Sequence, residues 1–276
     1  MKKLKMIIVN YYSIPDIQIL LDSIDSTTLS KIDVSVCIVD NTLCENQKEL
    51  LQSIVKKYVF IDIDLIFSKK NLGYFGAAHY AIRKEGFIGK YDFIALINPD
   101  IKFSNLDFLS EVQLDRNIGL LSINVVNQDL VPYNPFMKSS PKMTYLKLLR
   151  FISSYYFLYK TYELLHILKK KIKKIKTTKS QGFFKEDMYA SHGSVFIFTQ
   201  EAIRKGFDFA YPGFLFLEEL FVAEQMADMG LKTVYIGQIS AIHYEHQTTG
   251  KFKSKLMVGY LNQSINLFIK YLSKRG

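Results

Sequence analysis

Hydrophobic and polar positions follow two different periods along the first part of the chain. Short apolar runs of strand length are separated by segments in which apolar residues recur every three or four positions, the spacing of an amphipathic helix. Strands that alternate with helices predict an α/β fold, with a mostly parallel central sheet flanked by helices. We expect strands at 5–10, 34–39, 59–67 and 93–97, and helices at 16–23, 45–58 and 76–84.

The middle of the chain interrupts this alternation. Residues 132–141 contain three prolines and are typical of a loop, whereas 145–176 are expected to be helical, rich first in aromatic residues and then in lysine. The strand pattern returns at 189–198, so we interpret 137–182 as a helical, basic insertion in one domain. That single domain spans 1–276, with one half at 1–105, a second half at 185–250 and a C-terminal helix at 251–276.

Composition narrows the class of protein. Hydrophobic residues make up 49% of the chain, enough for a sizeable core, which excludes a wholly disordered chain. Cys37 and Cys44 form neither a disulfide framework nor a zinc motif, and this favours a reducing compartment. The basic, apolar start at 1–10 is too short for a secretory signal, and no apolar stretch reaches the roughly 20 residues of a membrane span. We therefore expect a soluble or peripheral protein.

Positive charge is abundant and unevenly placed. The formal net charge is +10, and the densest basic run is 169–176. Such a balance admits nucleic acid, an anionic membrane or a phosphate-bearing substrate as partner. The run has no interleaved aromatic residues and no nucleic-acid motif, so we expect no nucleic-acid partner. The apolar stretch 145–168 before it predicts either an interfacial helix on an anionic membrane or a packed helix with a solvated basic tail.

Polar side chains follow three of the expected strands, at the point where each strand ends. Because the carboxyl ends of parallel strands meet at one edge of a sheet, and ligands bind there, these side chains should converge on one site. They are Asn10 and Tyr11, then Asp40 and Asn41, and finally Asn98 and Asp100 on either side of Pro99.

Each of these groups also has a purely structural interpretation. A carboxylate such as Asp100 suits Mg²⁺ or Mn²⁺ that also holds a diphosphate, but the same triplet is a turn signal. Asp40 can accept hydrogen bonds from a nucleobase or a ribose, or it can cap the following helix. Asn71 and Gly73 belong to a glycine-bearing turn whose backbone amides can meet a phosphate or a sugar, or which is simply a tight turn.

Two further positions carry candidate chemistry in the second half. Glu218 and Glu219 follow an aromatic, apolar run, where a carboxylate with a raised pKa can act as a general base. The alternative is a pair of acids that favours the start of a helix at 220–229. His243 ends an apolar strand and is a candidate ligand or a core histidine, with His246 close behind it.

The order of these motifs resembles that of the family 2 glycosyltransferases, especially the rhamnosyl- and galactofuranosyltransferase-like members that build bacterial surface polysaccharides. The matching segments are 8–13, 38–41, 71–74, 96–100, 193–194, 216–219 and 242–243, which together cover about residues 5–250. The resemblance implies a GT-A (Rossmann-like) fold and inverting transfer of a sugar from a UDP- or dTDP-sugar to a saccharide acceptor. It also implies a divalent metal, Mn²⁺ or Mg²⁺, an acceptor linked to a lipid pyrophosphate, and a cytoplasmic enzyme at the inner face of the cell membrane.

Roles for single residues follow from the same resemblance. The half at 1–105 would bind the nucleotide sugar, and the half at 185–250 would carry the acceptor site and catalysis. Asp100 would bind the metal with His243 as a further ligand, and Glu219 would be the catalytic base with Glu218 as the alternative. The donor-binding residues would be Asn10, Tyr11, Asp40, Asn41, Asn71, Gly73 and Asn98.

Several positions depart from the family pattern. Glu219 replaces the usual aspartate, Phe221 replaces a second common acid, His79 stands where asparagine is frequent, and Gln263 lies about where many members have arginine. These departures leave open a sugar-nucleotide-binding relative that has lost catalysis. A basic nucleic-acid-binding protein with an α/β core is a third hypothesis, supported by charge alone.

Overall fold

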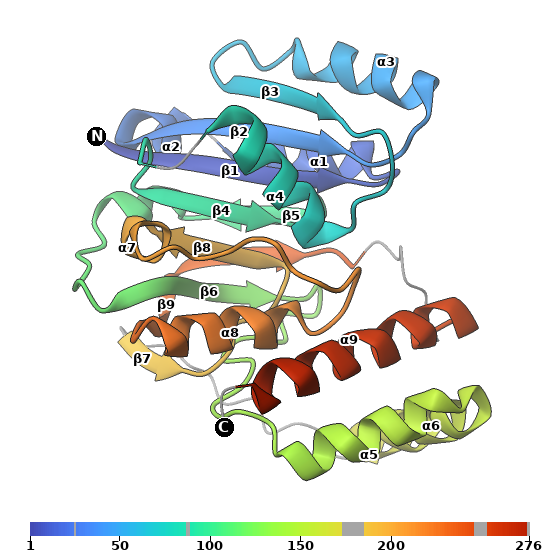
Figure 1. The fold of residues 1–276 in the computed structure, drawn as a ribbon. Helices are drawn as coiled ribbons and strands as arrows, with labels where there is room; N and C mark the ends of the chain where they lie inside the picture. The colour runs from blue at the N-terminus through green and yellow to red at the C-terminus, as the bar shows by residue number, and fades with distance from the viewer. Residues whose placement is uncertain (25, 87–88, 173–184, 246–252, 275–276) are drawn as a thin grey trace.

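A curled sheet runs through the molecule, and helices cover both of its faces (Figure 1). The computed structural model describes residues 1–24, 26–86, 89–172, 185–245 and 253–274. Over these residues the sheet has nine strands in the order β3-β2-β1-β4-β8-β6-β9-β5, with β7 paired to β9. The strands are β1 (Lys2–Asn10), β2 (Ile32–Asp40), β3 (Asp62–Phe67), β4 (Phe93–Ile97), β5 (Ile101–Ser104), β6 (Ile118–Val126), β7 (Lys185–Met188), β8 (Val195–Thr199) and β9 (Lys232–His243).

Most strands point the same way. β1 is parallel to β2 and β4, and β2 is parallel to β3. β8 is antiparallel to both β4 and β6, so β6 and its parallel neighbour β9 run in the direction of β1. Only β5, β7 and β8 oppose this direction in the described sheet. The expected mostly parallel α/β fold is therefore confirmed, and the carboxyl ends of β1, β2, β4, β6 and β9 share one edge.

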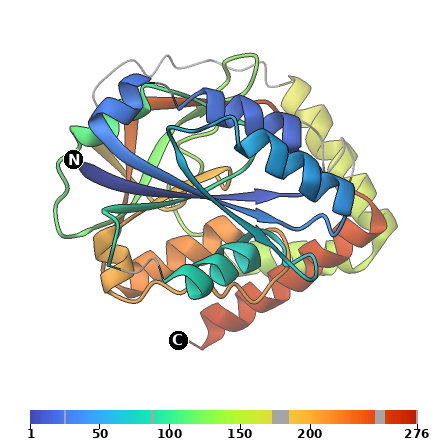
Figure 2. The same ribbon diagram turned by 90° about the horizontal axis from the view of Figure 1, so that it is seen from above.

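The helices divide between the two faces because side chains alternate along each strand. In β1, Leu4, Met6 and Ile8 join one buried cluster, whereas Ile7 and Val9 join the other. The first cluster includes α1 (Ile14–Asp22), α3 (Glu45–Val55) and the short helix η1 (Leu106–Ser110), close to α2 (Ser26–Lys31). The second includes α4 (Tyr74–Glu85), α7 (Gln200–Arg204) and α8 (Glu218–Asp228), and Figure 2 shows the two sets on opposite sides of the sheet.

Three more helices form a smaller layer beside the sheet. α5 (Met143–Ser154) and α6 (Tyr156–Ile172) pack on α9 (Lys255–Ser273) around a third buried cluster. The hydroxyls of Tyr145 and Tyr162 lie 3.3 Å apart, so α5 and α6 run back along each other as a hairpin. This hairpin lies within the segment 137–182, and Figure 1 shows α9 between it and α8.

Several expected elements have different bounds in the structure. The helix expected at 45–58 ends at Val55, and the strand pattern expected at 189–198 is confined to Val195–Thr199. The strand expected at 59–67 begins only at Asp62, because Val59 and Phe60 lie on the surface with 76% and 87% of their area exposed. The helix expected over 145–176 is two helices, because Tyr155 adopts an extended conformation and turns the chain back. The strands β5, β6 and β7 were not expected.

Candidate active site

The predicted strand-end residues lie at one edge of the sheet. Asn10 and Asp40 are paired in register at the ends of β1 and β2. The amide N–H of Asn98, directly after β4, donates to the carbonyl of Ser194 at 2.9 Å, which brings the 192–194 loop to the same edge. β9 ends at His243, which is paired with Ile101 in the strand that follows Asp100. The topology therefore brings both halves of the chain together here.

Asp40 and Asn10 form the buried corner of this edge. The side-chain amide of Asn10 donates to Asp40 Oδ1 at 2.8 Å, and both residues are almost fully buried. The Thr42 hydroxyl donates to the same carboxylate at 2.8–2.9 Å, and the Thr42 amide donates at 3.2 Å. Asp40 therefore does not cap α3, whose N-cap is Cys44, and its two oxygens accept from Asn10 and Thr42 of its own chain.

Asn41 connects this corner to the turn at Gly73. Its side-chain amide donates to the Gly73 carbonyl at 3.2 Å, and its Oδ1 accepts from the Ser68 hydroxyl at 3.1 Å. Asn71 Oδ1 accepts from the Gly73 amide at 3.0 Å. Gly73 has φ +72°, and a Cβ there would lie 2.4 Å from the Phe214 carbonyl oxygen, so only glycine fits. This glycine fixes the start of α4 against the loop before Glu218.

Tyr11 is the most accessible of the predicted donor-site residues. It is 44% exposed, and its ring meets the edge of the Tyr12 ring with centroids 5.0 Å apart. Tyr12 has φ +58° and donates through its hydroxyl to the Thr42 carbonyl at 3.2 Å. A pair of open aromatic rings beside a polar corner offers a surface on which a planar base can stack.

Glu218 and Glu219 begin α8, which follows a strained turn. Phe216 and Leu217 both have positive φ, +72° and +64°, which is costly for side chains of this size. The Tyr211 hydroxyl donates to the Phe216 carbonyl, and the Ser264 hydroxyl from α9 donates to the Leu215 carbonyl at 2.6 Å. These contacts hold the turn, which aims both carboxylates at the edge of the sheet.

The two carboxylates have different surroundings. Burial, together with the charge of Glu219, raises the pKa of Glu218 to about 8, so this group keeps its proton at neutral pH. Burial also raises the pKa of Glu219, and backbone hydrogen bonds oppose the rise of the pKa in both acids. The charge of the neighbouring acid raises the pKa of Glu218 alone. A Cβ on Gly193 would lie 2.5 Å from Glu219 Oε1, so the glycine leaves room for this carboxylate. Glu219 is the better placed of the two to ionise.

Tyr74 is a site residue to which sequence reasoning gave no role. Its hydroxyl is buried and has no hydrogen-bond partner within the part of the chain that the structure describes. Burial raises its pKa, and the charges of Glu218, Glu219 and Asp100 raise it further. Its phenol therefore lies within the field of the acid pair and of the predicted metal ligand. The sequence signal was its place directly after Asn71-Leu72-Gly73 in a matching motif.

Asp100 and His243 meet at the other side of the site. His243 Nε2 lies 3.2 Å from Asp100 Oδ1, and only 11% and 12% of these side chains are exposed. His243 Nδ1 is buried and finds no partner among the described residues. Beside them, His192 stacks on Tyr133 with centroids 4.5 Å apart. Burial, followed by the nearby His243, lowers the pKa of His192 to about 4, so its ring is neutral.

The Asp100–His243 pair is the structure's counterpart of the predicted metal ligands. Among the described residues, no three His, Cys, Asp or Glu side chains converge to hold an ion. Asp100 offers a carboxylate and His243 offers an imidazole whose Nε2 faces that carboxylate, and Mn²⁺ accepts both types of ligand. The pair therefore fits a divalent ion whose remaining ligands come from a bound diphosphate.

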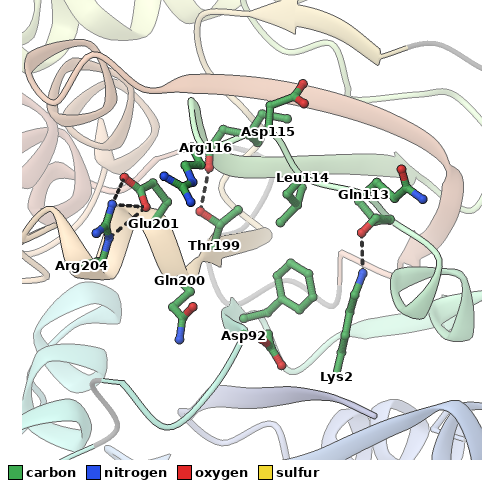
Figure 3. A pocket seen from close by; sticks show the side chains of 13 residues that line it. Lys2, Asp92, Gln113, Leu114, Asp115, Arg116, Thr199, Gln200, Glu201 and Arg204 are labelled. Atoms are coloured by element: carbon green, nitrogen blue, oxygen red, sulfur yellow. Dashed lines mark hydrogen bonds and ion pairs between the residues drawn. The ribbon is translucent and has the colours of Figure 1, made fainter.

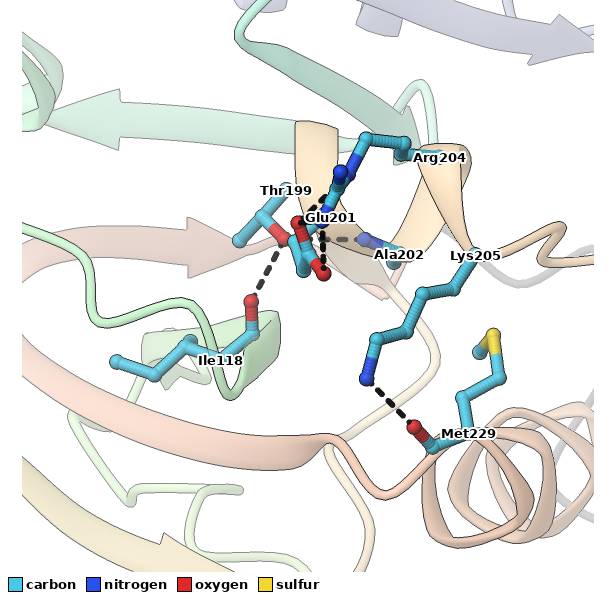
Figure 4. A network of polar contacts seen from close by, with 7 residues as sticks. All are labelled: Ile118, Thr199, Glu201, Ala202, Arg204, Lys205 and Met229. Carbon is cyan, nitrogen blue, oxygen red and sulfur yellow. Dashed lines mark hydrogen bonds and ion pairs between the residues drawn. The ribbon is translucent and has the colours of Figure 1, made fainter.

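A wide depression of about 690 Å³ lies elsewhere, at the amino ends of β1 and β4 (Figure 3). Lys2, Asp92, Arg116, Glu201 and Arg204 are among the residues that line it. Its polar groups are engaged locally: Glu201 and Arg204 pair at 2.9–3.0 Å. In the neighbouring network of Figure 4 the Thr199 hydroxyl donates to the Ile118 carbonyl at 2.7 Å. None of the predicted site residues lines this depression.

Comparison with known proteins identifies the fold. No protein-family model matches the sequence, and no curated protein matches it. Among solved structures, GalNAc-T7 with UDP, GalNAc and Mn²⁺ is similar, with 12% identity and a TM-score of 0.61 over 96% of this chain and 48% of that one. The mannosyltransferase PcManGT from Pyrobaculum calidifontis, with GDP-Man and Mn²⁺, gives 14% identity and a TM-score of 0.52 over 90% and 58% of the two chains.

A third similar structure is Staphylococcus aureus TarS, with 11% identity and a TM-score of 0.52 over 88% of this chain and 36% of that one. The chain thus spans about half the length of the first two structures and less of the third. At these identities the likeness concerns the fold. The chain has the GT-A fold, as its resemblance to glycosyltransferases implied.

Proposed function

We propose that the chain is an inverting glycosyltransferase, which moves a sugar from a nucleoside-diphosphate donor to an acceptor hydroxyl. The observation that carries the proposal is the meeting of two acidic groups at the carboxyl edge of the sheet. Asp100 with His243 forms one group, and Glu218 with Glu219 forms the other. The charges of the acids in both groups raise the pKa of the Tyr74 hydroxyl. The similar structures with UDP or GDP-Man and Mn²⁺ support this choice of donor class and ion.

The donor would occupy the edge formed by β1, β2 and the turn before α4. Tyr11 offers a ring on which the base can stack, and Asn71 would shape the same corner by holding the Gly73 amide at 3.0 Å. Asp40 would act by fixing Asn10 and Thr42, because its oxygens already accept from both. Asn41 and Asn98 complete the donor-binding set by holding their loops.

Asp100 and His243 would hold Mn²⁺ or Mg²⁺ against the diphosphate. Such an ion, when bound, neutralises negative charge on the departing diphosphate. The chain adds its own contributions to the same end of the site. Neutral His192 adds no positive charge beside the proposed ion, and the Tyr74 hydroxyl, which remains protonated, can donate to a phosphate or sugar oxygen.

Glu219 would be the general base. It would take the proton of the acceptor hydroxyl as that oxygen forms a bond to the anomeric carbon, while the bond from this carbon to the diphosphate breaks. Attack from the face opposite the diphosphate inverts the anomeric centre. Glu218, which keeps its own proton at neutral pH, leaves Glu219 as the carboxylate able to accept one.

The finer features of the proposal come from the sequence resemblance. They are a UDP- or dTDP-sugar donor, a rhamnosyl- or galactofuranosyl-type transfer, and a saccharide acceptor linked to a lipid pyrophosphate. In this view the protein works in the cytoplasm, peripheral to the inner face of the cell membrane, in the synthesis of bacterial capsule, O-antigen or cell-wall polysaccharide.

Donor binding is the most direct test. UDP- and dTDP-sugars should raise the melting temperature in the presence of Mn²⁺, because a ligand that binds only the folded state stabilises it. The shift should disappear with EDTA. The variant Asp33→Asn should show the same shift in melting temperature as the wild type, because Asp33 is exposed near the amino end of β2, on the opposite edge of the sheet. A screen in which no nucleotide sugar moves the melting temperature would contradict the proposal.

Product analysis separates the remaining hypotheses. Release of nucleoside diphosphate with transfer to an acceptor supports the enzyme. Metal-dependent binding without any hydrolysis or transfer would instead support a relative that has lost catalysis, which the departures at Glu219 and Phe221 leave open. Salt-dependent binding to DNA with no response to nucleotide sugars would favour the nucleic-acid hypothesis.

A further inference from the structure

The outer surface of the α5–α6 hairpin is unusually apolar. Of the nineteen exposed large hydrophobic residues in the described part of the chain, seven lie on these two helices and an eighth, Tyr155, lies between them, with 41–85% of their area accessible. We call this set the hairpin face. It comprises Tyr145, Leu148, Phe151, Tyr155, Phe157, Leu158, Leu164 and Leu165.

The spacing of these residues makes the hairpin amphipathic. In α5 they recur every three or four positions, and in α6 the pairs 157–158 and 164–165 are two turns apart. The opposite side of each helix is already partnered, since Leu146 and Tyr159 are buried against Val258, Leu261 and other residues of α9. Figures 1 and 2 place the hairpin at the periphery, beyond α9. The side chains of the hairpin face therefore remain exposed to solvent in the folded, described part of the chain.

The same hairpin carries a strong positive charge. Between residues 142 and 172 the only acid is Glu163, which pairs with Lys160 at 2.8 Å. The basic residues of this stretch are Lys142, Lys147, Arg150, Lys160, Lys169, Lys170 and Lys171. The lysine run continues in sequence to Lys176, outside the described residues. Aromatic and leucine side chains flanked by lysine and arginine are what an interfacial membrane helix requires.

We propose that the hairpin face docks on the surface of an anionic lipid bilayer. A second copy of the chain fits poorly, because it would bring two strongly basic surfaces together. Nucleic acid would pair with the lysines but would leave the exposed leucines of both helices in water. No helix of the described chain is long and apolar enough to cross a bilayer, and docking in the interface needs none. A lipid surface satisfies both the apolar side chains and the charge.

The position of the hairpin gives this docking a consequence for the candidate active site. Glu163 of α6 accepts from the Lys253 amide at 3.3 Å, and the Lys253 ammonium lies 5.6 Å from the ring centroid of Phe216. Phe216 precedes Glu218 in the strained turn. Docking would therefore hold the acid pair near the lipid surface, where an acceptor carried on a lipid would arrive. This last step rests on the proposed function, whereas the docking itself does not.

Vesicle cosedimentation of the full chain tests the docking. We expect binding to vesicles of phosphatidylcholine and phosphatidylglycerol, weaker binding at high salt, and little binding to phosphatidylcholine alone. The combined variant Phe157→Gln, Leu164→Gln and Leu165→Gln should lower the partition coefficient by at least about tenfold, because each large apolar side chain contributes about that factor when buried. Glutamine is a good helix former, so exposed positions should tolerate it.

A matched control tests whether position or mere exposure matters. Val59→Gln, Phe60→Gln and Leu130→Gln together remove apolar residues that are 70–87% exposed on other loops, and they should leave vesicle binding unchanged. Replacing the six lysines between Lys169 and Lys176 with glutamine should weaken binding to anionic vesicles only. Circular dichroism confirms that each variant is folded.

Four outcomes would overturn the docking. In the first, the wild-type protein does not bind anionic vesicles at low salt, and in the second, the hairpin and control variants lose vesicle binding equally. In the third, the wild-type protein forms a dimer that the hairpin variant does not form, and neither protein binds vesicles. In the fourth, the wild-type protein binds DNA more tightly than vesicles. Sugar transfer to a water-soluble acceptor tests the proposed function separately, and the hairpin variant should retain it. Vesicle binding without transfer would therefore contradict the proposed function and leave the docking intact.

Discussion

Both edges of the sheet hold charged side chains, but the surroundings of these side chains differ. At the amino edge, the depression of Figure 3 contains Glu201 paired with Arg204, and Lys2 bonded to backbone carbonyls of the 109–112 segment. At the carboxyl edge, His243 Nδ1 and the Tyr74 hydroxyl are buried without partners among the described atoms. A third such atom, the Thr233 hydroxyl, lies on β9 near its amino end.

The comparison shows that a surface depression indicates a functional site less well than buried polar atoms without hydrogen-bond partners do. The charged side chains at the amino edge are paired locally or exposed to solvent, and the Thr233 hydroxyl is the buried side-chain atom near that edge that has no partner among the described residues. The carboxyl edge combines partnerless buried atoms, two consecutive residues with positive φ before Glu218, and a carboxyl whose pKa is raised to about 8. Such a combination is costly for folding alone and is expected where a ligand completes the site.

The largest expected effect is that of Asp100→Ala. The variant removes the carboxylate of the proposed metal site and should abolish turnover, with loss of the Mn²⁺-dependent donor shift in melting temperature. Glu201→Gln at the amino edge is the matched control, because it removes an equally real ion pair, and should retain wild-type turnover. Comparable activity in both variants would remove the distinction between the edges. Steady-state kinetics with varied Mn²⁺ measures both.

Glu219→Gln should lower kcat by about 10²–10⁴-fold, the contribution of a general base, while donor affinity barely changes. Glutamine keeps the size of the side chain and its contact with Gly193, so the loss concerns the proton acceptor. Glu218→Gln should cost much less at neutral pH, because the native Glu218 already carries a proton. The opposite order of the two losses would transfer the role of base to Glu218.

The fold was largely predictable because its signals are local. The ends of β1, β2 and β4 fall at Asn10, Asp40 and Ile97, where the apolar runs end and polar residues begin. Val59 and Phe60 misled the strand prediction, since apolar residues at a loop look the same in sequence as the start of a strand. The turn at Tyr155 was missed because no proline or glycine marks it.

The candidate site was only partly predictable, for a different reason. That Asp100 faces His243 depends on the pairing of β5 with β9, two strands more than a hundred residues apart in sequence. Tyr74 stands in a recognised motif, but its closeness to Glu218 and Glu219 depends on contacts between distant segments, such as that of Gly73 with the Phe214 carbonyl. Long-range pairing and close backbone contacts leave no periodic trace in a single sequence, so neither relation could be derived from it.

Tyr74→Phe should lower activity moderately without lowering the stability of the fold. Its hydroxyl is buried and has no partner in the described chain, so its removal relieves a desolvation cost of about 1–3 kcal/mol. The melting temperature should therefore hold or rise, while kcat/KM falls by about tenfold, the worth of one hydrogen bond to a charged ligand oxygen. Tyr58→Phe is the control, because that hydroxyl donates to Asp22 at 2.7 Å. It should lose slight stability and no activity.

The last expected effect is a dependence of stability on pH that is caused by Glu218. The pKa of this carboxyl is 4.5 in an ordinary setting and about 8 in the fold, chiefly because of burial. A raised pKa in the folded state means that its contribution is fully present below 4.5 and falls as pH rises, because the unfolded chain releases a proton that the folded chain retains. The loss ends once the pH passes about 8, where the folded group also ionises.

Glu218→Gln cannot titrate, so its melting temperature should decline less than that of the wild type between pH 4.5 and 8. Arg204→Gln at the amino edge should leave the wild-type slope unchanged, because Arg204 is exposed and its pairing with Glu201 is solvated. The measurement is thermal unfolding across this window for the three proteins. Identical slopes in wild type and Glu218→Gln would mean that Glu218 is ionised in the folded chain. Both acids would then be ionised, and the protonation of Glu218 would no longer distinguish Glu219 as the general base.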